Sequence, residues 1–263
     1  MKKIPVLIII PHGGYKVPEE LEKFVIAGDF EIFISADTCA NEIFSFEKFA
    51  AAVINTSISK LLIDLNRQPF DIPPKTDDGV IKKLTPFGKT IFEENIFPDK
   101  IAITNILKRY YYPFHEAVGK ISNSDDIRLI IECHTIPAIE NYNSGEKSNP
   151  LFRISYKADI NSRTVETCPK VFAEILMQNL QKNFSDEKSG SRNKFEINDR
   201  PLLTSIITKN FSRIPYLRLD ISKQLFLNDE YFNYDYMKVD QLRLSSIKKK
   251  IWISIDKMYN KCF

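Results

Sequence analysis

The apolar run from Pro5 to Ile10, followed at once by Pro11-His12-Gly13-Gly14, constrains the fold more than any other stretch of the chain. An unbroken run of branched side chains is typical of a strand that is buried on both faces. The two glycines allow a sharp turn and a close approach of the backbone to a ligand, while the strand fixes the direction of the His12 side chain. We therefore expect the end of a buried strand to deliver His12 to a site.

A second histidine has the same setting, because the apolar run 129–131 is followed by Glu132-Cys133-His134. In an open α/β sheet the carboxyl ends of parallel strands share one edge, where ligands bind, so His12 and His134 would meet there. Each histidine alone is equally compatible with a polar side chain bonded to a backbone carbonyl. Neutral imidazole is the commonest metal ligand in proteins, and a catalytic zinc needs three protein ligands and one open position. The pair therefore favours a metal site with a third ligand still to be found.

The pattern of elements predicts one α/β domain over residues 1–263. We expect strands at 51–55, 61–64, 128–132 and 216–221, a helix beginning at 17–21, and further helices at 38–48, 101–121, 169–182 and 239–258. Pro113 should kink the helix that contains it. The alternation of strands and helices predicts a three-layer α/β/α sandwich with a mixed, mostly parallel central sheet, of the phosphorylase/hydrolase-like kind.

Composition excludes several classes of function. The 37 basic and 34 acidic residues are interspersed, and the dense run Lys248–Lys250 lies in a helical pattern, which argues against nucleic-acid binding. The four cysteines are far apart and form no C-x-x-C pair, as expected of reduced thiols in a cytoplasmic protein. The apolar run near the amino terminus is too short for a signal peptide or a membrane span. We expect neither nucleic acid nor membrane as a partner.

The polar residues expected at strand ends could together form one metal-dependent hydrolytic site. Two histidines and a carboxylate would form a zinc site with an open position, a further carboxylate could act as a base, and an arginine offers a planar fork to a substrate carboxylate. The residues in question are His12, Asp37, Asn66, Arg67, His134 and Asp220. Some have structural alternatives: Asp37 as a helix cap, Arg67 held by Asp64, and Asp220 paired with Arg218 or Lys223.

Four stretches resemble, in the same order, those of the N-formylglutamate amidohydrolase family, between about Pro5 and Phe226. They are Pro11-His12-Gly13-Gly14, Asp64-Leu65-Asn66-Arg67, Glu132-Cys133-His134-Thr135 and residues 217–226, LRLDISKQLF. The third stretch stands where the family has Asp-x-His-Ser. The second also looks like the Asn-Arg pair that holds the substrate carboxylate in aspartoacylase and zinc carboxypeptidases.

The resemblance implies that His12 and His134 bind Zn²⁺ and that Asp37 completes the set, with Glu42 as a nearby alternative. It also implies that Asn66 and Arg67 bind the carboxylate of an N-acyl amino acid. Arg200 falls in Asn198-Asp199-Arg200-Pro201, which loosely resembles a substrate loop of the family.

This chain departs from the family at the presumed base, because Asp220 stands where the family has a glutamate and is one methylene shorter. The lysine and glycines expected beyond Pro201 are also missing. The expected function is a zinc-dependent amidohydrolase that cleaves an N-acyl amino acid, N-formyl compounds included, or a small peptide with a free carboxylate. The alternative is a protein that binds acidic metabolites without hydrolysing them.

Overall fold

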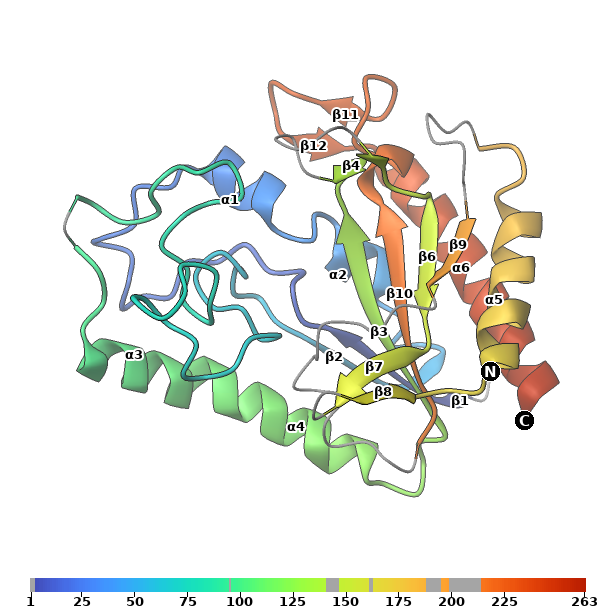
Figure 1. Ribbon diagram of the computed structural model, residues 1–263. Helices are drawn as coiled ribbons and strands as arrows, with labels where there is room; N and C mark the ends of the chain where they lie inside the picture. The colour runs from blue at the N-terminus through green and yellow to red at the C-terminus, as the bar shows by residue number, and fades with distance from the viewer. Residues whose placement is uncertain (1–2, 95, 141–146, 161–162, 188–194, 199–213) are drawn as a thin grey trace.

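The computed structural model describes residues 3–94, 96–140, 147–160, 163–187, 195–198 and 214–263. Its centre is a six-stranded sheet with the strand order β2-β1-β3-β10-β6-β9 (Figure 1). The strands are β1 (Ile4–Ile10), β2 (Ala50–Asn55), β3 (Leu129–Ile136), β6 (Phe152–Ser155), β9 (Phe195–Asn198) and β10 (Tyr216–Ser222). Neighbouring strands from β2 to β10 are parallel, β6 runs antiparallel to β10, and β9 is parallel to β6. The predicted mixed, mostly parallel sheet is confirmed.

Helices cover both faces of this sheet. On one face lie α2 (Ala40–Phe44), α5 (Lys170–Asn183) and α6 (Gln241–Cys262). The other face carries α3 (Lys100–Ile106), the π-helical turn Leu107–Tyr111 and α4 (Tyr112–Ser122). Figure 1 shows α5 and α6 on the opposite side of the sheet from α3 and α4. These layers confirm the predicted sandwich.

The remaining elements are short. Helix α1 (Asp29–Ser35) precedes α2, and a 3₁₀ turn (Lys223–Leu225) follows β10. Three small antiparallel pairs are formed by β4 (Ile139–Glu140) with β5 (Lys147–Ser148), β7 (Lys157–Ile160) with β8 (Arg163–Glu166), and β11 (Phe232–Asn233) with β12 (Lys238–Val239). Among the described residues, no helix combines the length and the apolar character needed to cross a membrane.

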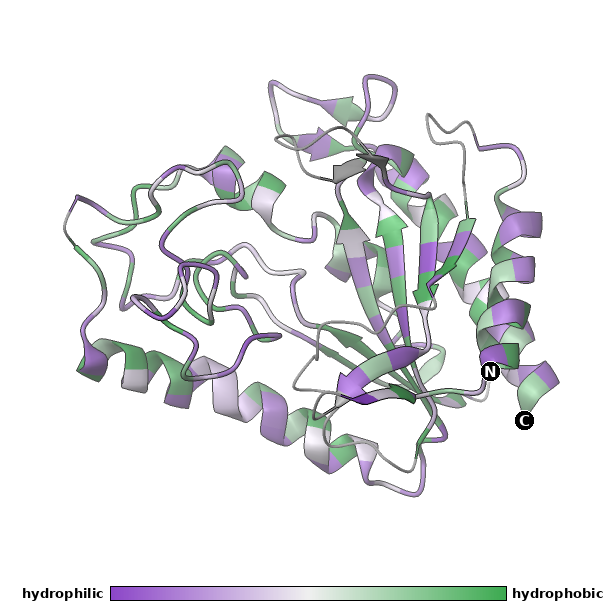
Figure 2. Cartoon of the chain, viewed as in Figure 1, coloured by the Kyte–Doolittle hydropathy of each residue, from purple (hydrophilic) through white to green (hydrophobic). Residues whose placement is uncertain are grey.

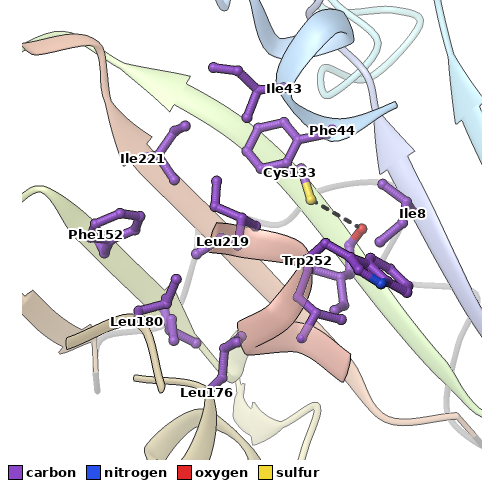
Figure 3. Packing of buried hydrophobic residues seen from close by; sticks show 14 of the residues in the cluster. Ile8, Ile43, Phe44, Cys133, Phe152, Leu176, Leu180, Leu219, Ile221 and Trp252 are labelled. Atoms are coloured by element: carbon purple, nitrogen blue, oxygen red, sulfur yellow. Dashed lines mark hydrogen bonds between the residues drawn. The ribbon is translucent and has the colours of Figure 1, made fainter. Parts of the chain in front are cut away.

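The core has two parts because the central strands are buried on both faces. Under α2, α5 and α6, Ile8, Cys133 and Leu219 of the sheet pack with Phe44 and Trp252 of the helices (Figure 3). Side chains alternate along a strand, so the neighbouring residues of β3 and β10 point to the opposite face. In Figure 2 hydrophilic bands interrupt these two otherwise apolar strands. The polar face of β3 and β10 is where the site lies.

Two predicted elements are wrong. Residues 17–18 are irregular and residues 19–24 form turns, because the backbone on either side is bonded to distant segments, in the bridges Lys16–Ile58 and Val25–Phe92. Residues 61–64 also form a turn, in which the backbone N–H groups of Leu62 and Ile63 donate to Ser59 O. A short apolar run does not distinguish a strand from another buried segment by its period, and this one packs against the second part of the core.

The two predicted helices 169–182 and 239–258 are confirmed as α5 and α6, whereas the helix expected at 38–48 shortens to α2. The helix expected at 101–121 forms, with a π-helical turn at 107–111 just before Pro113. Proline lacks an N–H and its ring crowds the preceding turn, and a wider turn at that point relieves both problems.

Candidate metal and substrate site

Three segments bring the candidate ligands together. His12 follows β1, His134 lies near the end of the adjacent strand β3, and Asp37 follows α1. The backbone N–H of Asp37 donates to His12 O over 3.0 Å. The Nζ group of the buried Lys223 donates to Ile34 O at 2.8 Å and to Ala36 O at 2.7 Å. These bonds hold the segment that carries Asp37 against the ends of β1 and β10.

The side chains of His12, Asp37 and His134 converge. Asp37 Oδ2 lies 2.7 Å from His134 Nδ1 and 3.7 Å from His12 Nδ1. All three residues are buried, and one possible ligand atom from each lies within 4.8 Å of the others. Glu42, the alternative third ligand, lies exposed on α2 and does not belong to this cluster. The structure therefore brings Asp37 to the two histidines.

Each histidine is also held by a second carboxylate on its outer side. His12 Nε2 lies 2.9 Å from Asp64 Oδ1, and His134 Nε2 lies 2.6 Å from Glu132 Oε1. A carboxylate accepts the proton of the nitrogen that it faces, which fixes the tautomer and leaves the other nitrogen with its lone pair. In both histidines the remaining nitrogen is Nδ1, which faces Asp37. His134 Nδ1 is hydrogen-bonded to Asp37 Oδ2, and a metal ion bound here would take the place of the proton between them.

This arrangement fits a divalent metal. Two imidazole nitrogens and one carboxylate oxygen form the donor set of an open zinc site, and the outer carboxylates are the partners that metal-binding histidines usually have. Lys60 Nζ lies 2.6 Å from Asp37 Oδ1, so Asp37 offers Oδ2 as its single open donor. Burial alone would raise the pKa of Asp37, but Lys60 and the two histidines outweigh burial and hold that pKa well below its usual value.

Glu132 is fully buried and tightly held. Besides His134, its partners include the Tyr216 hydroxyl and Asn66 Nδ2, which donates to Oε1 over 2.7 Å. Burial opposes ionisation, but the hydrogen bond and charge of His134, with Arg218 and Asn66, lower the pKa of Glu132 to about 2. Glu132 is therefore an anion that orients its neighbours and a weak proton acceptor.

A pocket of about 550 Å³ opens onto the cluster. Its walls come from β3, β10 and the loops at 60–67 and 77–86, and most of its lining residues are polar or charged. The lining residues are His12, Asp37, Lys60, Asp64, Asn66, Arg67, Asp77, Asp78, Lys82, Leu84, Thr85, Pro86, His134, Thr135, Ile136, Pro137 and Arg218. Arg67 pairs with the exposed Asp78 and keeps about a third of its own side chain exposed, which places it at the rim. The buried Lys82 lies 3.0 Å from Asp64 Oδ2.

Asp220 lies beside the site. It stands opposite His134 on the neighbouring parallel strand, so the two side chains share a face of the sheet. Its carboxylate is buried, and Oδ1 accepts a 2.6 Å hydrogen bond from Arg218 Nε. Arg218 lines the pocket, whereas Asp220 is not among the described residues that do. Arg200, the remaining candidate, lies outside the described residues.

Sequence reasoning missed the pocket cations Lys60, Lys82 and Arg218. It also missed the roles of Asp64 and Glu132 as partners of the histidines. A signal existed for Glu132, which stands two residues before His134 in a strand and must share its face. The same spacing relates Arg218 to Asp220. No local pattern pointed to Lys60 or Lys82, because the loops that carry them reach the site only in the folded chain.

Comparison with known proteins identifies the family to which the chain belongs. Residues 4–227 match a family described as N-formylglutamate amidohydrolase. The crystal structure of N-formylglutamate amidohydrolase from Ralstonia eutropha JMP134 is similar, with a TM-score of 0.74, 14% identity, and coverage of 99% of this chain and 94% of that one. A gene product from Agrobacterium tumefaciens is also similar, with a TM-score of 0.61, 14% identity, and coverage of 99% and 91%. A comparison with curated protein sequences found no match.

Proposed function

We propose that this protein is a zinc-dependent amidohydrolase. The chain belongs to the N-formylglutamate amidohydrolase family, and this membership supports an enzyme that hydrolyses amide bonds. Its substrate is an N-acyl amino acid, N-formyl compounds included, or a small peptide with a free carboxylate. The observation that carries the metal dependence is the convergence of His12 Nδ1, His134 Nδ1 and Asp37 Oδ2 while both Nε2 atoms face buried carboxylates.

In this proposal His12, Asp37 and His134 hold the metal, which supplies Lewis acidity to the site. Asp64 and Glu132 fix the orientation of the two imidazoles, and Lys60 turns one oxygen of Asp37 away from the ligand position. These contacts keep the donor atoms in place before any substrate arrives.

Asp220 is the proton acceptor of the proposed reaction. Asp37, Asp64 and Glu132 each contact a histidine, whereas Asp220 accepts its hydrogen bond from Arg218, at Oδ1. In the hydrolysis, a water oxygen adds to the acyl carbon and the carbon–nitrogen bond breaks. Asp220 takes a proton from the water and passes it to the leaving nitrogen, which departs as the free amine.

Arg67 and Asn66 bind the substrate carboxylate in this proposal. Arg67 sits at the pocket rim, where an incoming carboxylate can replace the exposed Asp78 as its partner. Asn66 Nδ2 uses one of its two hydrogens on Glu132, which leaves the other for a ligand. On the sequence resemblance alone we extend the substrate site to Arg200.

The contact between Arg218 and Asp220 favours a second candidate, a protein that binds acidic metabolites without hydrolysing them, because the proposed base is already engaged. Turnover separates the two. Zinc-loaded protein should release free amine from at least one member of a panel of N-formyl, N-acetyl and N-succinyl amino acids, and protein stripped by a chelator should not. Full zinc occupancy with no amine released from any member would favour the binding protein.

A further inference from the structure

We infer that Arg218 contacts the substrate and binds the acyl carbonyl oxygen as negative charge develops on it. The inference rests on the proposed hydrolysis and gives a role in it to a residue to which the proposed machinery assigns none. Arg218 lines the same pocket as His12, Asp37 and His134.

The side chain of Arg218 is directed along β10 toward the site. Residue 218 stands opposite Glu132 on β3, and its Nε reaches Asp220, two residues further along the strand and opposite His134. The guanidinium therefore lies on the same sheet face as His134. The charges of Glu132 and Asp37 act on Arg218, so these groups are its electrostatic neighbours.

The guanidinium is held at one edge and open at the other. Asp220 binds Nε, and within the described part of the chain no hydrogen-bond partner is found for the two Nη groups. Neither Nη atom is both buried and unsatisfied, and the side chain is 23% exposed, so these donors face the pocket. Burial opposes the charge on Arg218, but Asp220, Glu132 and Asp37 outweigh burial and raise its pKa, which keeps the guanidinium charged.

A fixed, charged donor of this kind suits a developing oxyanion. Donors that are oriented before the reaction need no reorganisation when charge appears, and removal of one such donor typically costs about 10²–10³ in kcat. Arg67 is less suited, since it lies at the rim and is paired with Asp78. Of the two arginines that line the described pocket, Arg218 is the one on the sheet face that carries His134.

Hydrolysis proceeds by addition of water to the acyl carbon and loss of the amine. As the water oxygen bonds to the acyl carbon, the electron pair of the carbonyl double bond moves onto the carbonyl oxygen, where the Nη groups of Arg218 donate to it. When the carbon–nitrogen bond breaks, that pair returns to re-form the carbonyl, and the leaving nitrogen receives the proton that Asp220 carried. Arg218 keeps its own protons throughout.

The test compares Arg218→Lys with a matched control, Arg243→Lys. Arg243 is also a largely buried arginine paired with a carboxylate, Glu187, but it lies on α6, away from the pocket. Zinc-loaded proteins are assayed for kcat and KM on the best substrate of the panel, and for binding of N-methylphosphonyl-glutamate and the N-methylphosphonyl analogue of that substrate, whose tetrahedral phosphonyl groups carry the negative charge of the oxyanion. Arg218→Lys should lower kcat by about 10²-fold, change KM by less than about 3-fold, and weaken phosphonyl binding by about 10²-fold.

Zinc content and Tm of Arg218→Lys should match those of Arg243→Lys. If Arg218→Lys does not fold, the double variant Arg218→Gln/Asp220→Asn, which removes both charges, takes its place in the binding assay. Unchanged kcat and phosphonyl affinity would overturn the inference. So would a loss confined to KM that disappears for substrates without a carboxylate, because Arg218 would then bind the carboxylate.

The two proposals fail in different ways. If the unsubstituted protein turns over no panel member, the proposed function fails, while phosphonyl binding still reports on Arg218. If the unsubstituted, zinc-loaded protein hydrolyses a substrate but does not bind the N-methylphosphonyl analogue of that substrate, the role of Arg218 is overturned and the amidohydrolase stands.

Discussion

At the scale of single residues, the proposed metal site depends on the Nδ1 atoms of His12 and His134, which face Asp37. His12→Ala and His134→Ala should each abolish stoichiometric zinc, because each removes one of the three proposed ligands. Asp64→Asn should be milder, with a 10–100-fold weaker zinc affinity, since it disturbs only the outer partner of His12. Elemental analysis and competition with a chromogenic chelator measure both effects. Full zinc occupancy in the two alanine variants would place the metal elsewhere.

Arg67 offers a residue-scale test of the substrate end. Arg67→Lys keeps the charge but loses the two-pronged donor, so KM should rise for substrates with a free carboxylate and change little for their methyl esters. The measurement is steady-state kinetics on matched acid and ester pairs. An equal loss on both would show that Arg67 is structural, in line with its contacts to Asp78 and Asp64.

Asp220, the proposed base, stands where the sequence resemblance leads us to expect a glutamate. Asp220→Asn should lower kcat by about 10²–10⁴-fold without removing the metal, because it can no longer accept a proton. Asp220→Glu should keep the metal and leave kcat equal or higher, since the carboxylate gains reach. Near-normal turnover in the Asn variant would remove Asp220 from the reaction and leave it as the partner of Arg218.

At the scale of elements, the turn after β1 determines how the site is assembled. A Cβ at Gly14 would overlap the backbone of Ser57 and Ile58, in the segment that leads to Lys60. Gly14→Ala should therefore lower the free energy of unfolding by about 1–3 kcal/mol, as overpacking does. Gly119→Ala is the control, because a Cβ there meets nothing within 4 Å and α4 should gain about 0.5–1 kcal/mol. Urea unfolding measures both, and equal stability of the two variants would contradict the packing argument.

At the scale of the whole molecule, Lys223 links the end of the central sheet to the segment before Asp37. Burial, with the charge of Lys60, lowers its pKa from 10.5 to about 7. Between pH 7 and 10.5 the unfolded chain therefore binds a proton that the folded chain lacks, and the free energy of unfolding should rise with pH. Below about pH 7 both states are protonated, so this dependence vanishes and the cost of burying the charge is full.

Lys223→Met should remove this rise, which has a limiting slope of about 1.4 kcal/mol per pH unit. Urea unfolding at pH 7, 8 and 9 gives the slope for each protein, with the exposed Lys257→Met as a control that should keep the slope of the unsubstituted chain. Parallel curves for Lys223→Met and the unsubstituted chain would show that Lys223 does not change its protonation there.

Local sequence patterns were enough to predict the strongly periodic elements and the residues at their ends. The apolar spacing specifies the type and the buried faces of β1, β10, α5 and α6, and it predicts that His12 and His134 share one sheet edge. What surrounds the two histidines depends on tertiary contacts. Asp64, Lys60 and Lys82 lie on loops whose course is set by contacts with distant segments, so no local period marks them, and the choice of Asp37 over Glu42 depends on the turn of the chain between α1 and α2. The pairing of Asp220 with Arg218, one of the two partners that the sequence offered, is confirmed, but that Arg218 also lines the pocket depends on the walls that distant loops build around it.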